Sequence, residues 1–352
     1  MKTDGGSSGA HPNRRVYLGL VLTMFFWGSA FATSKMLVLD VSPEVGAALR
    51  FGIGSLLMMA ILVRRSAKPI PARADWGRLA VVSLVGVTGF NTLFFRGLSL
   101  APASDAGIII PTMSPVFTAM AGMLFLGERA RFGRIAGLAV SLAGAVLFFG
   151  DVLFHTAGQG GRVWGDAALI GAAICWAATS ILSRPLSVRI GAMPTAAWTI
   201  FLGSLVLLLV SSPKLAAVPW GQLTGRFWIV LAYVVIFPTV IAYILWMEGI
   251  RAIGSGPTTS FMFLAPVFAL LIAAALLGER PTSLQGAGGA LMLLGVWLIN
   301  RPGERGSPLR RRGSPAGPPS AGRFLRRRSS PASFRRRSAA STPASRRTSP
   351  RG

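Results

Sequence analysis

Aromatic and amide side chains inside long apolar runs are the residues of this sequence best suited to bind a small molecule. Flat rings offer apolar surface, while an indole N–H, a phenol hydroxyl or an amide adds a few directed hydrogen bonds. A cavity lined in this way suits a neutral, zwitterionic or mildly amphipathic organic solute. The candidates for such a lining are Trp27, Asn91, Phe95, Trp176, Tyr243 and Trp246.

A tryptophan near the end of an apolar run can instead anchor a protein at a membrane surface, an alternative that fits Trp246. Trp27 and Trp176 lie inside their runs, and Trp27-Gly28 recurs later in the chain as Trp176-Ala177. For these two residues a place in a cavity lining is the favoured interpretation.

Prolines inside the apolar runs are candidates for breaking helices and for gating. Because proline lacks an amide N–H, a helix that contains it leaves a carbonyl unpaired, and a ligand can use that carbonyl. The alternative is that the prolines only fit a helix against its neighbours. The residues concerned are Pro111, Pro115, Pro238 and Pro266.

Three charged residues lie in or beside the apolar runs. Arg50 stands inside one of them, where an ionisable residue is a functional candidate by default. It could instead extend to the lipid headgroups or pair with Glu44, and this structural use is the favoured interpretation. Asp105 and Glu248 stand at the edges of two further runs, and both fit charges at helix ends.

No motif indicates an enzyme or a metal site. The sequence contains no H-E-x-x-H pair, no G-x-S-x-G turn, no phosphate-binding loop and no clustered carboxylates. Cys175 is the only cysteine, so no internal disulfide can form. The sequence therefore predicts no catalytic residue, no cofactor and no bound metal.

Membrane-spanning helices must position these residues. The chain is 52% hydrophobic and only 13% charged, against about 25% charged in soluble domains. Its uncharged windows are long enough to cross a bilayer, which takes roughly 20 residues. The sequence predicts an all-α polytopic membrane protein with ten spans, at 16–34, 45–63, 79–95, 106–126, 135–150, 167–183, 190–210, 227–247, 257–277 and 282–300.

The distribution of arginine and lysine predicts the orientation. Ten spans put both termini on one side, and most basic residues of the connections fall on that side, including Arg64, Arg65, Arg129 and Arg131. Because basic loops stay in the cytoplasm, both termini are predicted to be cytoplasmic.

The chain repeats itself. Pro115-Val116-Phe117 matches Pro266-Val267-Phe268, and in the same register Gly127-Glu128-Arg129 falls on Gly278-Glu279-Arg280. Five spans per half is an odd number, so the second half must enter the membrane in the opposite sense, as an inverted repeat. For both Gly-Glu-Arg turns a structural role is predicted, with glycine ending a helix and the charges held at the water interface.

These motifs resemble the EamA domain family of the drug/metabolite transporter superfamily. The resemblance rests on the Trp-Gly of the first span, Arg50-Phe51 opening the second, and Pro-Val-Phe followed by Leu-Gly-Glu-Arg, and it covers roughly 16–300. The second half departs from it, with Ala177 in place of glycine and no arginine early in its second span. The resemblance implies a ten-helix carrier of the inner or plasma membrane, of a kind that often exports metabolites, and it leaves the solute open.

The predicted domains follow from the repeat and from composition. They are a cytoplasmic segment 1–15, a first five-helix repeat 16–150, an external linker 151–164, a second repeat 165–300 and a tail 301–352. The tail is rich in arginine, serine and proline, which predicts disorder and contact with anionic lipids rather than with nucleic acid. The oligomeric state stays open, with a homodimer as one option.

The predicted function is transport of a small organic metabolite, such as an amino acid, a nucleoside or a drug-like solute, through alternating access around a central cavity. Export is the expected direction. A membrane-embedded enzyme and a non-selective pore are the alternatives. No histidine lies in an apolar run, so the residue best suited to proton relay is missing there. The energy coupling stays open between proton antiport, exchange and facilitated diffusion.

Overall fold

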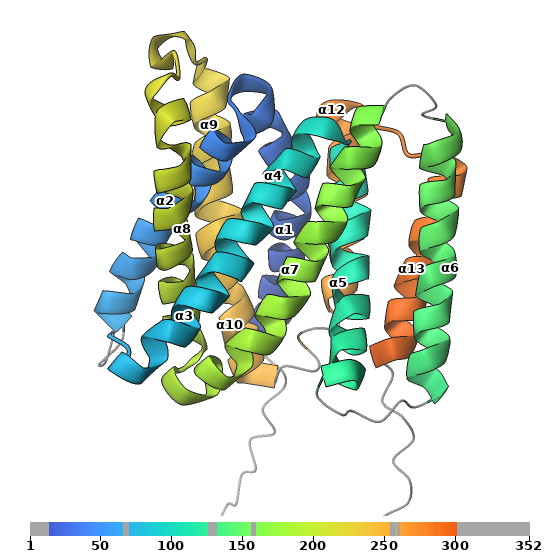
Figure 1. Ribbon diagram of the computed structural model, residues 1–352, viewed down its shortest axis with the longest axis horizontal. Coiled ribbons are helices and arrows are strands. Elements are labelled where there is room, and N and C mark those ends of the chain that lie inside the picture. The colour runs from blue at the N-terminus through green and yellow to red at the C-terminus, as the bar shows by residue number, and fades with distance from the viewer. Residues whose placement is uncertain are drawn as a thin grey trace, which may run out of the picture. The chain divides into compact units, whose positions relative to one another are not determined.

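A computed structural model describes residues 14–65, 70–125, 132–155, 160–253, 258 and 261–300, and the structural statements below concern these residues. Every regular element among them is helical (Figure 1). The first half contains α1 (Arg14–Asp40), α2 (Pro43–Arg65), η1 (Arg73–Asp75), α3 (Trp76–Ser83), η2 (Leu84–Gly89), α4 (Phe90–Leu100), α5 (Ala103–Phe125) and α6 (Phe132–His155). The second contains α7 (Gly160–Ile190), α8 (Ala192–Ala216), η3 (Trp220–Gln222), α9 (Gly225–Val234), η4 (Val235–Ile241), α10 (Ala242–Ile253), η5 (Phe261–Leu264), α12 (Ala265–Leu277) and α13 (Ser283–Asn300).

The predicted all-helical class is confirmed. By length and composition, seven helices of the described residues could cross a membrane, counting α3 with α4 and α9 with α10 as continuous rods. Three more are apolar but shorter, within α6, α12 and α13. The count of ten membrane spans therefore stays a prediction.

Some helices differ from the sequence prediction. Residues 151–155 end α6 and residues 160–164 begin α7, so most of the predicted linker 151–164 is helical. Pro111 and Pro115 lie inside α5, which continues through both, and Pro266 stands in the first turn of α12. A first-turn amide has no partner within its own helix, so proline is tolerated there and does not interrupt the helix.

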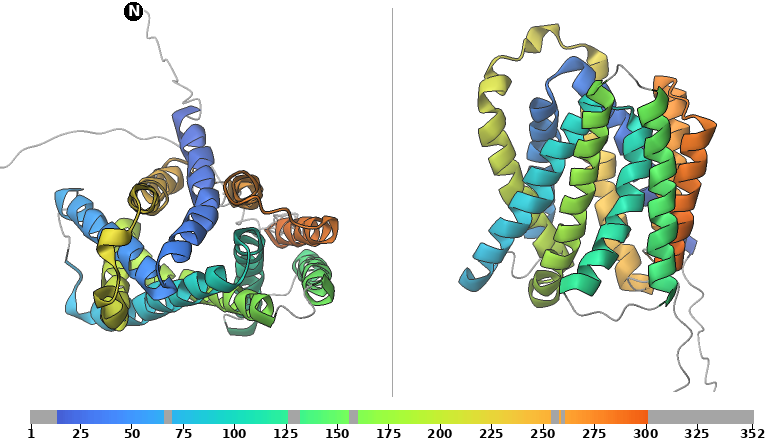
Figure 2. Two further views of the ribbon diagram at one scale, coloured as in Figure 1. Left: turned by 90° about the horizontal axis from the view of Figure 1, so that it is seen from above. Right: turned by 45° about the vertical axis from the view of Figure 1, so that its right-hand side comes forward.

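Helices of corresponding rank in the two halves pack against each other. The last helices of the halves, α6 and α13, lie side by side (Figures 1 and 2). A Cβ added to Gly137 would lie 2.7 Å from the carbonyl oxygen of Gly295, and one added to Gly144 would lie 2.7 Å from that of Gly288. The sequence register of the repeat pairs Gly137 with Gly288 and Gly144 with Gly295. Replacing each glycine by its repeat partner therefore turns the first contact into the second. The helix pair has the two-fold symmetry of an inverted repeat.

The remaining helices follow the same exchange. The Oγ of Ser204 in α8 donates to the Oγ of Ser55 in α2 at 2.9 Å, and both serines stand in Gly-Ser-Leu runs. The first helix of each half packs on the other half, α1 on α10 and α12, and α7 on α4 and α5. The two halves therefore form one interlocked bundle, in which small residues let the backbones approach.

Substitution of Gly288 tests the α6–α13 contact. Its added Cβ would lie 2.8 Å from the Gly144 carbonyl oxygen and 2.8 Å from the Phe148 nitrogen, so backbone must move. We expect Gly288→Ala to lower the free energy of unfolding by about 1–3 kcal/mol, measured by thermal unfolding in detergent. Gly286→Ala is the matched control in the same helix, since nothing lies within 4 Å of its added Cβ. Equal stability of the two variants would contradict the tight pairing.

The third span of each half contains a π-helical segment. In the register that pairs Arg96 with Glu248, the first segment, Leu84–Gly89, falls on residues 236–241 of the second, Val235–Ile241. π-Helical turns are rare and often mark functional positions, because they leave carbonyls without their usual partners. The corresponding interruptions single out these two helices as candidates for binding or movement.

Candidate functional site

A row of aromatic rings connects α1 and α4 of the first half with α7 of the second half. Phe31 of α1 lies 5.9 Å from Phe94 of α4, and Phe94 stacks on Phe90 at 5.6 Å. Phe90 then lies 5.4 Å from Trp176 of α7, and all three distances are measured between ring centroids. Of the predicted lining residues, Trp176 belongs to this row and Phe95 contacts it, with its ring centroid 5.3 Å from that of Phe94. Phe31, Phe90 and Phe94 were missed because no pattern singled them out among the 21 phenylalanines of the chain.

Trp27 of α1 and Trp246 of α10 form a second pair of aromatic rings. Their ring centroids are 5.1 Å apart, and the Trp27 Nε1 donates to the carbonyl oxygen of Pro238 at 3.2 Å. Pro238 stands in the π-helical segment η4, so the indole satisfies a carbonyl at an interruption. The two tryptophans repeated in the sequence thus contact the interrupted third span of the opposite half, Trp27 on η4 and α10 and Trp176 on α4.

The other predicted lining residues are buried or half-buried among packed helices. Phe95 is fully buried and packs against Gly46 of α2. The Tyr243 hydroxyl is 3.4 Å from the carbonyl oxygen of Ala192, and the ring packs beside Met58 and Val240. The Asn91 amide donates to its own helix at the Val87 carbonyl, while its buried Oδ1 has no partner.

Arg50 does not use the partners expected from the sequence. Its side chain is 7% exposed, so it does not extend to the headgroups, and it forms no ion pair with Glu44. Residues six apart lie on different faces of a helix, and the Glu44 carboxylate instead meets Lys214 Nζ at 2.8 Å. Arg50 donates to two hydroxyls, Ser34 Oγ and Thr239 Oγ1.

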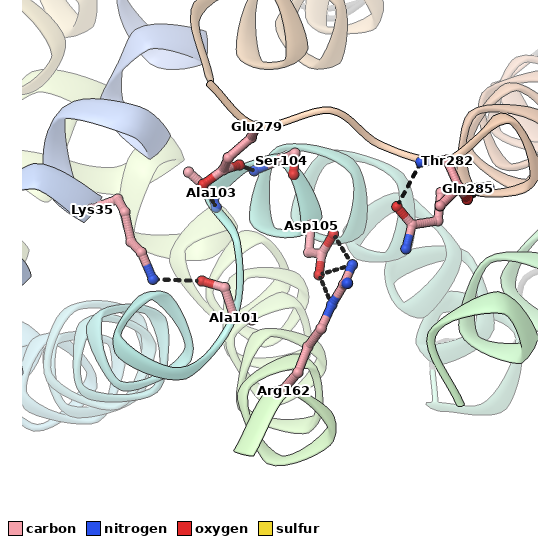
Figure 3. Close-up of polar contacts among 9 residues, drawn as sticks. All are labelled: Lys35, Ala101, Ala103, Ser104, Asp105, Arg162, Glu279, Thr282 and Gln285. Carbon is pink, nitrogen blue, oxygen red and sulfur yellow. Dashed lines mark hydrogen bonds and ion pairs between the residues drawn. The ribbon is translucent and has the colours of Figure 1, made fainter. Parts of the chain in front are cut away.

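The second Gly-Glu-Arg turn closes one end of the bundle. Gly278 ends α12 with a left-handed φ of 67°, and Glu279 then reaches back to the first half. Its two carboxylate oxygens accept hydrogen bonds from the backbone nitrogens of Ala103, at 2.8 Å, and Ser104, at 2.7 Å (Figure 3). These nitrogens begin α5, where a helix has unpaired donors and a positive dipole end, so the carboxylate stabilises the helix start.

Further charges gather at the same end, which we call the Glu279 cluster: Lys35, Asp105, Arg162, Asp166 and Glu279. Lys35 Nζ donates to the carbonyl oxygens of Leu98 and, at 2.9 Å, Ala101, where α4 ends. The guanidinium of Arg162 holds the Asp105 carboxylate through two bonds of 2.9 and 3.0 Å (Figure 3). Asp105 is fully buried, so this end of the bundle is held by ion pairs and helix caps away from water.

Asp166 was missed from the sequence because it directly precedes the predicted span 167–183. The helix α7 begins at Gly160 and places Asp166 inside its second turn, only 2% exposed. Neither of its carboxylate oxygens has a hydrogen-bond partner. The cluster thus contains three carboxylates beside two cations.

Figure 1 shows α5 and α7 side by side at the end holding the Glu279 cluster, and apart at the other end. The burial along α7 follows this divergence. Ala172 and Ala173 are fully buried, but Trp176, one turn later on the same face, is 37% exposed, and Ser180 is exposed as well. α7 is therefore packed into the bundle near the Glu279 cluster, and its side chains are less buried at Trp176 and Ser180.

A cavity of about 170 Å³ lies between α5, α12 and α13. Its lining is nearly all apolar and includes Ile108, Thr112, Pro266, Leu270 and Leu293. None of the predicted aromatic residues lines this cavity, and it is smaller than the roughly 300 Å³ that drug-sized ligands need. It does not coincide with the predicted binding site.

The remaining predicted residues lie on the surface or outside the described part of the chain. Glu248 is exposed in α10 and Arg280 is exposed after α12, while Gly127, Glu128 and Arg129 lie outside the described residues, as does the tail 301–352. In the described part of the chain no group of three His, Cys, Asp or Glu side chains could hold a metal ion.

Comparison with known proteins relates both halves to one family. The model of the EamA-like transporter family matches residues 14–150 and again 163–301. The chain is similar to the uncharacterized transporter YyaM of Bacillus subtilis, 27% identical over 282 residues that cover 80% of this chain and 92% of that protein. It is 30% identical over 289 residues to a probable terminal-alkyne amino-acid exporter of Streptantibioticus cattleyicolor, with coverage of 80% and 92%.

A solved crystal structure has the same fold, with a TM-score of 0.56 and 22% sequence identity. The match covers 81% of this chain and 97% of the chain in that structure. The apolar helices, the two corresponding halves and the repeated family match agree with one another. The chain belongs to the EamA-like transporter family.

Proposed function

We propose that the protein exports a small organic metabolite by alternating access, with ten membrane spans and both termini in the cytoplasm. The observation that carries this proposal is the exchange of contacts between the two halves. Each half packs its first helix on the interrupted third span of the other. Halves of opposite sense can exchange their conformations, and a central site then opens to each side in turn.

The Glu279 cluster is the closed outer gate of this proposal. Its contacts join the second half, through Glu279, to the start of α5 in the first half. The exposed Trp176 and Ser180 lie on the inward side of that gate, where a solute from the cytoplasm would enter. Positive charge in the loops supports this orientation.

An amino acid with an apolar side chain is the proposed solute class. The aromatic row from Phe31 to Trp176 consists of flat apolar rings, of which Phe90 and Trp176 are partly exposed. The probable terminal-alkyne amino-acid exporter is a relative of matching length. Contact of the basic tail with anionic lipids is a further proposal, drawn from composition alone. A homodimer is a second option.

Transport into liposomes tests the function. We expect purified protein in liposomes to move at least one labelled solute from a panel of amino acids, nucleosides and other metabolites faster than empty vesicles do. Movement of none of them would contradict the proposal.

Loss of a ring tests the site. Trp176→Ala and Trp27→Ala should each raise the KM for the transported solute about tenfold, since removing one aromatic contact weakens binding by roughly 1.4 kcal/mol. Trp164→Ala is the matched control, because Trp164 is 73% exposed near the start of α7. Wild-type KM values in both Trp27 and Trp176 variants would remove them from the site.

A further inference from the structure

The guanidinium of Arg50 is a buried cation with no carboxylate partner among the described residues. The side chain is only 7% exposed. Nε donates to Thr239 Oγ1 at 3.2 Å and Nη1 donates to Ser34 Oγ at 2.9 Å, and neither bond uses Nη2. A guanidinium has five N–H donors, and burying its charge beside neutral groups alone is costly. Its surroundings favour the arrival of an anion.

Arg50 lies well inside the bundle. It follows the start of α2 at Pro43 by two helical turns, which is about 10 Å along the helix axis. Close backbone packing fixes its position, because a Cβ added to Gly54, one turn later on the same face, would lie 2.9 Å from Thr239 Cγ2. The guanidinium is therefore held between α2, α1 and the π-helical segment η4.

The aromatic row begins one turn away from this cation. Ser34 holds the guanidinium and Phe31 stands three residues before it on α1, about 4.5 Å along the axis. The ring of Phe31 leads through Phe94 and Phe90 to Trp176. A cation at one end of an apolar surface matches a molecule that has an acidic group and an apolar body.

We propose that Arg50 binds the carboxylate of the transported solute, whose apolar part lies along the aromatic row. This assignment rests on the proposed transport function and names its substrate class: carboxylates with an apolar body, including amino acids. A guanidinium binds a carboxylate through two parallel hydrogen bonds, which is stronger and more selective than its bonds to hydroxyls.

Carboxylate binding would also act on the interrupted helix. Pro238 has no N–H, so the Val234 carbonyl lacks its usual donor, and the Thr239 hydroxyl donates to it instead at 2.8 Å. The same hydroxyl accepts from Arg50. A carboxylate that takes the guanidinium away from Thr239 removes this hydrogen bond between α2 and η4, which links solute binding to the packing of the eighth span.

Matched acids and amides test this assignment. In liposomes, we expect L-phenylalanine or L-leucine to be transported, or to compete with the transported solute, at least tenfold better than L-phenylalaninamide or L-leucinamide. Arg50→Gln should reduce this preference to about one. Arg50→Lys keeps the positive charge but loses the paired N–H donors of the guanidinium. It should therefore raise the KM for the acid about tenfold while kcat changes little.

Controls separate this role from a structural one. Ser99→Ala removes a hydroxyl whose exposed hydrogen bond is to a carbonyl of its own helix, so the preference for acids and KM should both stay unchanged. If Arg50→Gln does not fold, Arg50→Lys carries the test alone. An unchanged acid-to-amide preference and KM in Arg50→Lys would overturn the assignment while transport itself stands. Wild-type protein that moves no solute contradicts the proposed function instead.

Discussion

Arg162→Gln is expected to lower the free energy of unfolding by about 3–5 kcal/mol, because it leaves a buried carboxylate without its cation. Asp105 is fully buried and accepts both of its bonds to the guanidinium at 2.9 and 3.0 Å. Asp166, also buried, adds a second carboxylate with no partner of its own. Thermal unfolding in detergent measures the loss.

Two further variants make the Arg162 prediction specific. Lys214→Gln breaks the Lys214–Glu44 pair, whose Lys214 side chain is 53% exposed, so it should change stability by at most about 1 kcal/mol. Asp105→Asn combined with Arg162→Gln removes the unpaired charge and should restore much of the lost stability. A loss in Arg162→Gln no larger than in Lys214→Gln would show that the buried pair contributes little.

A covalent bridge across the Glu279 cluster is expected to abolish transport. The outer gate joins the second half to the start of α5 through the two hydrogen bonds of Glu279. In alternating access these bonds must break in every cycle for the solute to leave. Pro102 and Arg280 flank the bonded groups on either side, and Arg280 is exposed, so cysteines placed there can be joined by a short bifunctional thiol reagent.

The sequence predicted much of the fold because its signals are local. Uncharged windows predicted helices that the structure contains, and the Gly-Glu-Arg repeat led to two corresponding halves. The Trp27 and Trp176 pair also followed from that repeat. The structure adds that each tryptophan contacts the third span of the opposite half, which no local pattern specifies.

Long-range contacts were beyond the sequence. Glu279 was predicted to hold only its own turn, whereas it caps a helix that begins 176 residues earlier in the chain. Asp166 was placed outside a span because hydropathy locates the apolar window and not the full length of the helix around it. Arg50 has hydroxyl partners on α1 and η4, and tertiary packing alone brings those three elements together.

The most direct test of alternating access is transport by the bridged protein. Pro102→Cys and Arg280→Cys are combined with Cys175→Ser, which removes the only native cysteine. The control bridge joins Gly133→Cys to Leu298→Cys across the α6–α13 pair, where a Cβ added to Gly133 would lie 4.0 Å from the Leu298 carbonyl oxygen. We predict that cross-linking stops transport only in the Pro102–Arg280 variant and that cleaving the linker restores it. Undiminished transport by the fully cross-linked Pro102–Arg280 protein would contradict alternating access through this gate.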